Sequence, residues 1–125
     1  MVKKLAETDA LTGLLNRGAF NKELTDLCRQ NAVEAALVMF DLDHFKRLND
    51  TFGHLLGDKV IQFFATLLQN HAGEQHLAVR YGGEEMALIM LDINQREALK
   101  VIEEIRLSFA NCRLKRKVIR NLLAK

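Results

Sequence analysis

The feature that most constrains the fold of this chain is a pair of short apolar runs on either side of a glycine-containing turn. Residues 77–79 and 86–91 are entirely apolar, and residues 80–85 between them include Gly82 and Gly83. Two β-like runs separated by such a turn predict an antiparallel hairpin. The two glycines leave the backbone bare at the tip, so that a ligand can approach main-chain N–H groups closely.

Two carboxylates, Glu84 and Glu85, follow the glycines directly. Neighbouring side chains of a strand point to opposite faces, so one of the two can face a ligand while the other faces elsewhere. A bare glycine tip beside a carboxylate suits an anionic ligand that is carried with a divalent metal ion. An ordinary hairpin with charged residues at its tip explains this stretch equally well.

Length and composition limit the class of protein. The chain has 125 residues, of which 49% are apolar and 27% charged, and these values predict a single globular domain over residues 1–125. No apolar run approaches the roughly 20 residues that span a bilayer, and no signal-peptide core follows the N-terminal charges. Cys28 and Cys112 lie far apart, which predicts free thiols in a reducing cytoplasm.

A further apolar run, residues 35–40, is followed by Asp41 and Asp43. A short run that is apolar on both faces predicts a buried central strand. The two aspartates are two positions apart and therefore share one face of that strand. Carboxylates at the end of a central strand commonly hold Mg²⁺, whose open positions take substrate phosphates, and we favour this interpretation over a solvated strand end.

Helical patterns separate these strands. Asn16 and Asn94 are suitable N-caps, and Glu97 completes a capping box with Asn94. The predicted helices cover about residues 17–30, 44–49, 54–71 and 95–109. The order helix, strand, helix, helix, hairpin, helix predicts an α/β (α+β) chain in which helices flank a mixed central β-sheet.

Three polar residues, Asn49, His54 and Asp58, surround the junction of the two middle helices. Asn and Asp side chains can pair with the edge of a purine, and Asp accepts hydrogen bonds from its N–H donors. His54 is equally well explained as a helix-start residue that packs on its neighbours.

The C-terminal stretch, residues 113–125, contains basic residues and no acidic one. No aromatic side chain is interleaved, so we expect no surface that stacks nucleic-acid bases and no nucleic-acid partner. A solvated basic tail over residues 110–125 is the favoured interpretation. The alternative is a short amphipathic helix through Val118, Ile119, Leu122 and Leu123.

Four motifs occur in order along the chain. They are Asp-Ala-Leu-Thr-Gly-Leu-Leu-Asn-Arg (9–17), Phe-Asp-Leu-Asp-His-Phe-Lys (40–46), Asn-Asp-Thr-Phe-Gly-His-Leu-Leu-Gly-Asp (49–58) and Arg-Tyr-Gly-Gly-Glu-Glu-Met (80–86). Together they closely resemble the GGDEF domain of bacterial diguanylate cyclases, over about residues 9–109. The resemblance implies a palm-like fold related to class III nucleotidyl cyclases. It also implies an enzyme that joins two GTP molecules into cyclic di-GMP and releases two pyrophosphates.

In this family each domain binds one GTP, and two domains meet so that the 3′-OH of each nucleotide attacks the α-phosphate of the other. The resemblance therefore implies a homodimer, with two divalent ions, Mg²⁺ or Mn²⁺, in each active site. Carried over to this sequence, Asp41 binds metal through its carboxylate and Leu42 through its carbonyl oxygen. Glu84 binds metal and accepts the 3′-OH proton, and Glu85 supports the same site.

The resemblance also implies two groups of residues that bind GTP. At the phosphates the glycines let the hairpin approach closely, and a lysine acts as a point charge. The residues at the phosphates are Gly82, Gly83, Phe45 and Lys46, and those at guanine and ribose are Asn49, Asp58 and His54.

The sequence departs from the family pattern in three places. The signature reads Gly-Gly-Glu-Glu-Met, and Met86 replaces the usual phenylalanine, an apolar exchange that preserves packing. Residues 73–76 lack the Arg-x-x-Asp pattern of a product-inhibition site, so we expect no feedback through it. After Phe109 the family's further strands and last helix are not recognisable, which implies a domain that is incomplete at its C-terminus.

This last departure leaves an alternative open, namely a catalytically inactive, shortened GGDEF domain that binds GTP or serves dimerisation and regulation. A missing strand would leave a sheet edge or gap that invites pairing with a second copy. GGDEF domains usually follow a sensor domain or a helical linker. This chain starts almost at the first motif, so we expect no sensor domain within it.

Overall fold

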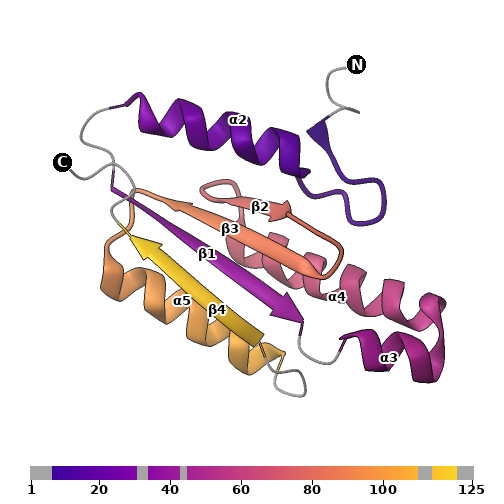
Figure 1. The fold of residues 1–125 in the computed structure, drawn as a ribbon. Coiled ribbons are helices and arrows are strands. Elements are labelled where there is room, and N and C mark those ends of the chain that lie inside the picture. The colour runs from indigo at the N-terminus through magenta and orange to yellow at the C-terminus, as the bar shows by residue number, and fades with distance from the viewer. Residues whose placement is uncertain (1–6, 31–33, 43–44, 110–113, 121–125) are drawn as a thin grey trace.

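The computed structural model describes residues 7–30, 34–42, 45–109 and 114–120. The helices are α2 (Arg17–Cys28), α3 (Phe45–Phe52), α4 (His54–Ala72) and α5 (Gln95–Ser108). The strands are β1 (Ala35–Leu42), β2 (Leu77–Arg80), β3 (Glu85–Leu91) and β4 (Leu114–Arg120) (Figure 1). Among these helices none is long and apolar enough to cross a membrane.

The strands form one sheet in the order β2-β3-β1-β4, and every ladder within it is antiparallel. An isolated parallel bridge joins Leu15 to Val79 beside the sheet. The hairpin predicted around Gly82 and Gly83 is confirmed as β2 and β3, which pair from Leu77 with Ile89 to Arg80 with Met86. The predicted α/β class with helices around a central sheet is confirmed, but the predicted mixture of parallel and antiparallel strands is not found among the described ladders, which are all antiparallel.

Strand β1 is buried on both faces, because helices cover the sheet from both sides (Figure 1). Alternate residues of β1 belong to two different apolar clusters. Phe40 lies in the cluster with α4 and α5, where its ring meets Phe64 edge to face at 5.5 Å. Leu37 lies in the cluster with Phe20 of α2. This two-sided burial explains why β1 reads as a continuous apolar run instead of an alternating one.

The helices begin where their capping residues predict. Asn16 accepts a hydrogen bond from the Ala19 N–H at 2.9 Å and starts α2. Asn94 accepts from the Glu97 N–H at 2.8 Å, and the Glu97 carboxylate accepts from the Asn94 N–H at 3.3 Å. This capping box satisfies main-chain donors that the first turn of a helix leaves unpaired.

The prediction for the C-terminal stretch is wrong over residues 114–120. These residues form β4, which pairs with β1 from Ala36 opposite Arg120 to Leu42 opposite Leu114. The unpaired N–H and C=O groups along an edge of β1 favour an added strand, and this long-range pairing overrides the local preference for a solvated tail or a helix. As a result, β1 has a hydrogen-bonded neighbour on each side.

His76 is a buried titratable residue just before β2, with an exposed fraction of 8%. Its Nδ1 accepts a hydrogen bond from the main-chain N–H of Leu91, the last residue of β3, at 3.0 Å. Burial lowers the pKa of His76 below its ordinary value of 6.5, because the interior disfavours the charged imidazolium. The neutral ring therefore ties the end of β3 to the segment that leads into β2.

This contact predicts how stability depends on pH. The unfolded chain binds a proton at His76 more readily than the folded chain does, so the contribution of His76 is fully present above its unfolded pKa of 6.5 and is lost as pH falls towards the lower folded pKa. His76→Asn keeps an acceptor for the Leu91 N–H and does not titrate. Urea unfolding between about pH 8 and about pH 5 should show a smaller loss of free energy of unfolding in the variant than in the wild type. Equal losses would contradict this assignment.

Candidate active site

Carboxylates from two strand ends meet in an open hollow of about 300 Å³, lined by Asp41, Gly83, Glu84 and Glu85. Asp41 lies near the end of β1 and is the cross-strand partner of Glu85, the first residue of β3. The Leu42 N–H donates a hydrogen bond to the Glu84 carbonyl oxygen at 3.1 Å, which holds the turn against the end of β1. The hairpin register thus brings together acids that lie far apart in the sequence.

Both Glu84 and Glu85 line the hollow, so the structure does not divide them between a ligand face and an opposite face. The alternation of side chains applies within a strand, and β3 begins only at Glu85. Glu84 belongs to the turn, where the chain direction changes. Asp43, the other acid predicted at the end of β1, lies outside the described residues.

The electrostatics of the hollow favour a cation. Burial raises the pKa of Glu84, and the nearby negative charges of Asp41 and Glu85 raise it further. Asp41 Oδ1 is buried and has no hydrogen-bond partner among the described residues. A buried, unpaired carboxylate oxygen beside two further acids matches the oxygen ligands that Mg²⁺ and Mn²⁺ take.

The described side chains do not complete a metal cage by themselves. Within the described ranges no group of three or more His, Cys, Asp or Glu residues is arranged to hold a metal ion. Mg²⁺ is usually bound by one or two carboxylates together with water and substrate phosphates. The hollow therefore fits an ion that arrives with a phosphorylated ligand better than a permanent structural metal.

Gly82 and Gly83 are not required by backbone strain, because neither has a positive φ. A Cβ added to Gly82 would meet only the end of the flexible Glu85 side chain, at 2.7 Å. A Cβ added to Gly83 would have no neighbour within 4 Å, although this residue lines the hollow. Packing among the described residues gives no reason for a glycine at position 83.

Apart from Gly82 and Gly83 of the hairpin, the residues predicted to bind GTP lie on α3 and α4. Phe45 and Lys46 begin α3, with Phe45 buried and Lys46 exposed, and α3 starts three positions after the last residue of β1 (Figure 1). Asn49 is half-buried on α3, whereas His54 and Asp58 are exposed on α4. None of these side chains is among the residues that line the hollow of the three acids.

Gly57 is a site residue that the sequence analysis missed. A Cβ at Gly57 would collide with Asn49 Oδ1 and would lie 3.2 Å from the Phe45 ring. Asn49 Oδ1 is itself buried and has no hydrogen-bond partner among the described residues. The glycine therefore lets α4 approach α3 so closely that the Asn49 side chain is held in place. A glycine inside an amphipathic helix was the available signal.

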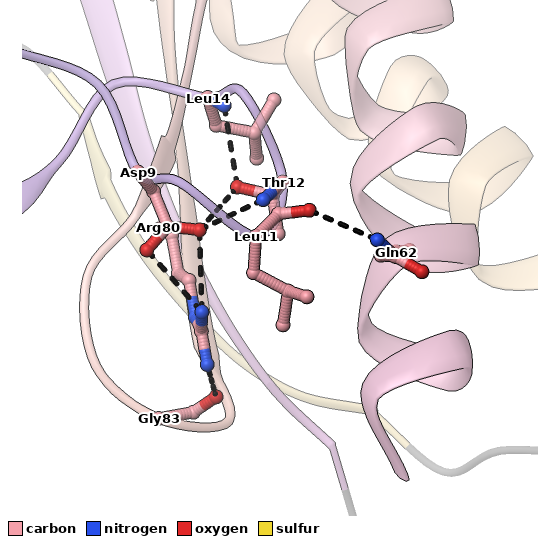
Figure 2. Close-up of polar contacts among 7 residues, drawn as sticks. All are labelled: Asp9, Leu11, Thr12, Leu14, Gln62, Arg80 and Gly83. Carbon is pink, nitrogen blue, oxygen red and sulfur yellow. Dashed lines mark hydrogen bonds and ion pairs between the residues drawn. The ribbon is translucent and has the colours of Figure 1, made fainter. Parts of the chain in front are cut away.

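Arg80 is a second residue that the sequence analysis did not single out. Figure 2 shows its guanidinium between the Asp9 carboxylate and the carbonyl oxygen of Gly83. In the sequence, Asp9 and Arg80 belong to two separate motifs, residues 9–17 and 80–86. Their contact joins residues 71 positions apart, and no local pattern reveals it.

The chain matches the family model described as "Diguanylate cyclase, GGDEF domain" over residues 6–120. It therefore belongs to the GGDEF family. The match extends past Phe109 and includes β4.

Characterised relatives agree with this assignment. The chain is 41% identical over 114 residues to diguanylate cyclase VdcA of Vibrio cholerae, covering 91% of this chain and 33% of VdcA. It is 40% identical over 107 residues to the response regulator PleD of Caulobacter vibrioides, covering 83% of this chain and 24% of PleD. The chain thus spans a third or less of the length of these relatives.

A solved structure shares the fold. The coiled-coil and GGDEF region of DgcB from Caulobacter crescentus, crystallised with c-di-GMP, superposes with a TM-score of 0.93 at 30% sequence identity. The superposition covers 99% of this chain and 74% of the DgcB chain.

The contact at Gly57 predicts the effect of a single methyl group. Gly57→Ala should lower the free energy of unfolding by about 1–3 kcal/mol, because the methyl group collides with Asn49 and overpacks the α3–α4 junction. Gly18→Ala is the matched control, since a Cβ there would lie 3.5 Å from Asn16 Oδ1, an ordinary contact. In α2 the control should be neutral or stabilising by up to about 1 kcal/mol. Equal effects of both changes in urea unfolding would refute the close contact.

Proposed function

We propose that this chain is the catalytic domain of a diguanylate cyclase, which condenses two GTP molecules into cyclic di-GMP and two pyrophosphates. The observation that carries the proposal is the hollow where Asp41, Glu84 and Glu85 meet, with a buried Asp41 oxygen that lacks a partner among the described residues. The family assignment and the relatives named as diguanylate cyclases support it.

The acids of the hollow suit two divalent ions, Mg²⁺ or Mn²⁺, in each active site. Asp41 and Glu84 would hold them through carboxylate oxygens, and Leu42 through its carbonyl oxygen. When bound, such ions neutralise phosphate charge and make a bound hydroxyl more acidic. Glu85 adds negative charge to the same hollow and would support the ligands.

Glu84 is also the proposed acceptor of the 3′-OH proton. Its position in the hollow beside Asp41, where a substrate hydroxyl carried with a metal ion would lie, supports this role. Phosphoryl-type transfer requires charge neutralisation and in-line positioning more than covalent help. Gly82 and Gly83 would admit the phosphates to the hairpin, with Phe45 and Lys46 beside them.

The second group of residues would bind the nucleoside. Asn49 Oδ1 is buried with no partner among the described residues, and an N–H group of guanine would satisfy it. Asp58, exposed on α4, would contact guanine or ribose, and His54 would line the same pocket. Each domain then presents one GTP, so that the reaction of two GTP molecules requires a homodimer. Cytoplasmic location is part of the proposal, since it fits the free thiol of Cys28.

The direct test is to incubate the protein with GTP and Mg²⁺ or Mn²⁺ and to separate the nucleotides by chromatography. We expect cyclic di-GMP from the wild type and a rate at least about 100-fold lower from Glu84→Gln, which keeps the side-chain shape but removes the charge and the proton acceptor. Glu103→Gln, a change in an exposed ion pair of α5, is the matched control and should leave the rate unchanged.

Intact GTP with no cyclic di-GMP would refute the proposal for this chain. A GTP-dependent rise in melting temperature under those conditions would indicate the alternative, a nucleotide-binding domain without turnover. Equal rates for Glu84→Gln and the wild type would remove Glu84 from the chemistry.

A further inference from the structure

Arg80 bridges the N-terminal turn of the chain and the tip of the hairpin (Figure 2). Its Nη1 lies 3.2 Å from both carboxylate oxygens of Asp9, and its Nη2 donates to the Gly83 carbonyl oxygen at 3.0 Å. The planar guanidinium can serve both partners at once because its N–H groups are fixed in a fork. A lysine ammonium at this position has no such fork.

Hydrogen bonds within its own turn hold the Asp9 carboxylate in place, independently of Arg80. Its Oδ2 accepts hydrogen bonds from the Thr12 N–H at 2.9 Å and from Thr12 Oγ1 at 2.8 Å. The main chain closes the same turn, since the Asp9 N–H donates to the Leu14 carbonyl oxygen at 2.7 Å. Burial alone would raise the pKa of Asp9, but the hydrogen bonds from Thr12 and the charge of Arg80 outweigh it and lower the pKa. The carboxylate is therefore ionised and oriented towards the guanidinium.

The turn of Asp9 is anchored to two elements of the fold. Gln62 of α4 donates through Nε2 to the Leu11 carbonyl oxygen at 3.1 Å. The Arg80 N–H donates to the Leu15 carbonyl oxygen at 2.8 Å, which ties the other side of the turn to β2. The turn thus gives Arg80 a rigid support.

The bond to Gly83 acts on the backbone of Glu84. The Gly83 carbonyl belongs to the peptide unit that contains the Glu84 N–H, so Arg80 restrains the plane before the Glu84 Cα. The plane after it is restrained by the Leu42 N–H, which donates to the Glu84 carbonyl oxygen at 3.1 Å. With both flanking planes held, the direction of the Glu84 Cα–Cβ bond is fixed.

We infer that Asp9 and Arg80 are positioning residues that aim Glu84 into the acidic hollow, with Asp9 acting only through Arg80. The inference rests on the proposed function, in which Glu84 binds metal and accepts a proton. It assigns to that function two residues, Asp9 and Arg80, that do not line the hollow themselves.

The burial of the ion pair agrees with this role. The side chains of Arg80 and Asp9 are exposed by only 19% and 21%, compared with 47% and 43% for the Arg106–Glu103 pair on α5. Charge-assisted hydrogen bonds strengthen as solvent is removed, whereas exposed pairs contribute little. The surface pair therefore provides a matched control of the same chemical type.

The test compares Asp9→Asn, Arg80→Met, their combination and Glu103→Gln. Asp9→Asn keeps an acceptor for Thr12 but removes the charge that orients Arg80. The probes are the Leu42, Tyr81 and Gly82 amides, which donate hydrogen bonds to the carbonyl oxygens of Glu84 and Glu85. In the metal-free protein we expect their hydrogen exchange to accelerate about threefold to tenfold in Asp9→Asn and in Arg80→Met. Because Asp9 acts through Arg80, the double variant should exchange no faster than Arg80→Met alone. Glu103→Gln should exchange like the wild type.

Metal binding and turnover give independent readouts. Calorimetric titration with Mn²⁺ should show weaker binding by a similar factor in Asp9→Asn and Arg80→Met, and not in Glu103→Gln. In an active protein kcat should fall while KM for GTP changes little, because the nucleoside contacts on α3 and α4 are untouched. If Arg80→Met does not fold, Arg80→Lys replaces it, because lysine keeps a positive charge beside Asp9. Hydrogen exchange at the same three amides is then measured in Arg80→Lys.

The outcomes separate the two claims. Unchanged exchange in Asp9→Asn and in the Arg80 variants overturns the positioning role, whatever the activity. Additive effects of the two substitutions overturn the statement that Asp9 acts through Arg80. Faster exchange and weaker Mn²⁺ binding in a protein that makes no cyclic di-GMP support the positioning role and refute the proposed function.

Discussion

The antiparallel pairing of β1 with β3 is the interaction on which the candidate site depends. It sets Asp41 opposite Glu85 and brings the Glu84 carbonyl to the Leu42 N–H. A slip of one residue would turn every side chain of one strand to the opposite face and would remove Asp41 from the hollow. The apolar residues on both faces of β1 prevent such a slip, since each face packs against its own cluster. The register that buries the core is therefore also the register that assembles the acids.

Bringing three carboxylates together opposes folding, because like charges on opposing strand positions repel. The structure places this repulsion at the end of the sheet, where the hollow is open, and keeps fully buried apolar side chains such as Met86 and Phe40 directly behind it. Met86 occupies the position where the family usually has phenylalanine, and its complete burial agrees with the expectation of preserved packing. The unfavourable charge repulsion among the three carboxylates is thus offset by the burial of apolar side chains next to them.

Features that depend on neighbours in sequence were predictable. The hairpin follows from its glycine turn and flanking apolar runs, and the helix starts at Asn16 and Asn94 follow from side chains that bond to a main-chain N–H three positions on. The buried strand β1 follows from its apolar run. The placement of Asp41 near Glu84 required the family resemblance in addition, because their side chains meet only through tertiary pairing.

Features that depend on distant contacts were not predictable. The strand β4 exists because β1 offers it a free edge, and its own composition indicates a solvated segment. Glu84 joins Glu85 in the hollow because Glu84 belongs to the turn and β3 begins only at Glu85. Gly57 and Arg80 gain their importance from Asn49 and Asp9, which approach them from other elements. Periodicity carries no information about these partners.

The enclosure of β1 also has a consequence for the order of folding. Residues 35–40 form an uncharged, entirely apolar stretch, and such a segment is prone to aggregate when its edge is exposed. Of its two neighbours, β4 is the last strand in chain order, so a growing chain leaves one edge of β1 open until residue 120 has been synthesised. The edge of the strand that carries Asp41 is thus open to intermolecular pairing until residues 114–120 pair with it.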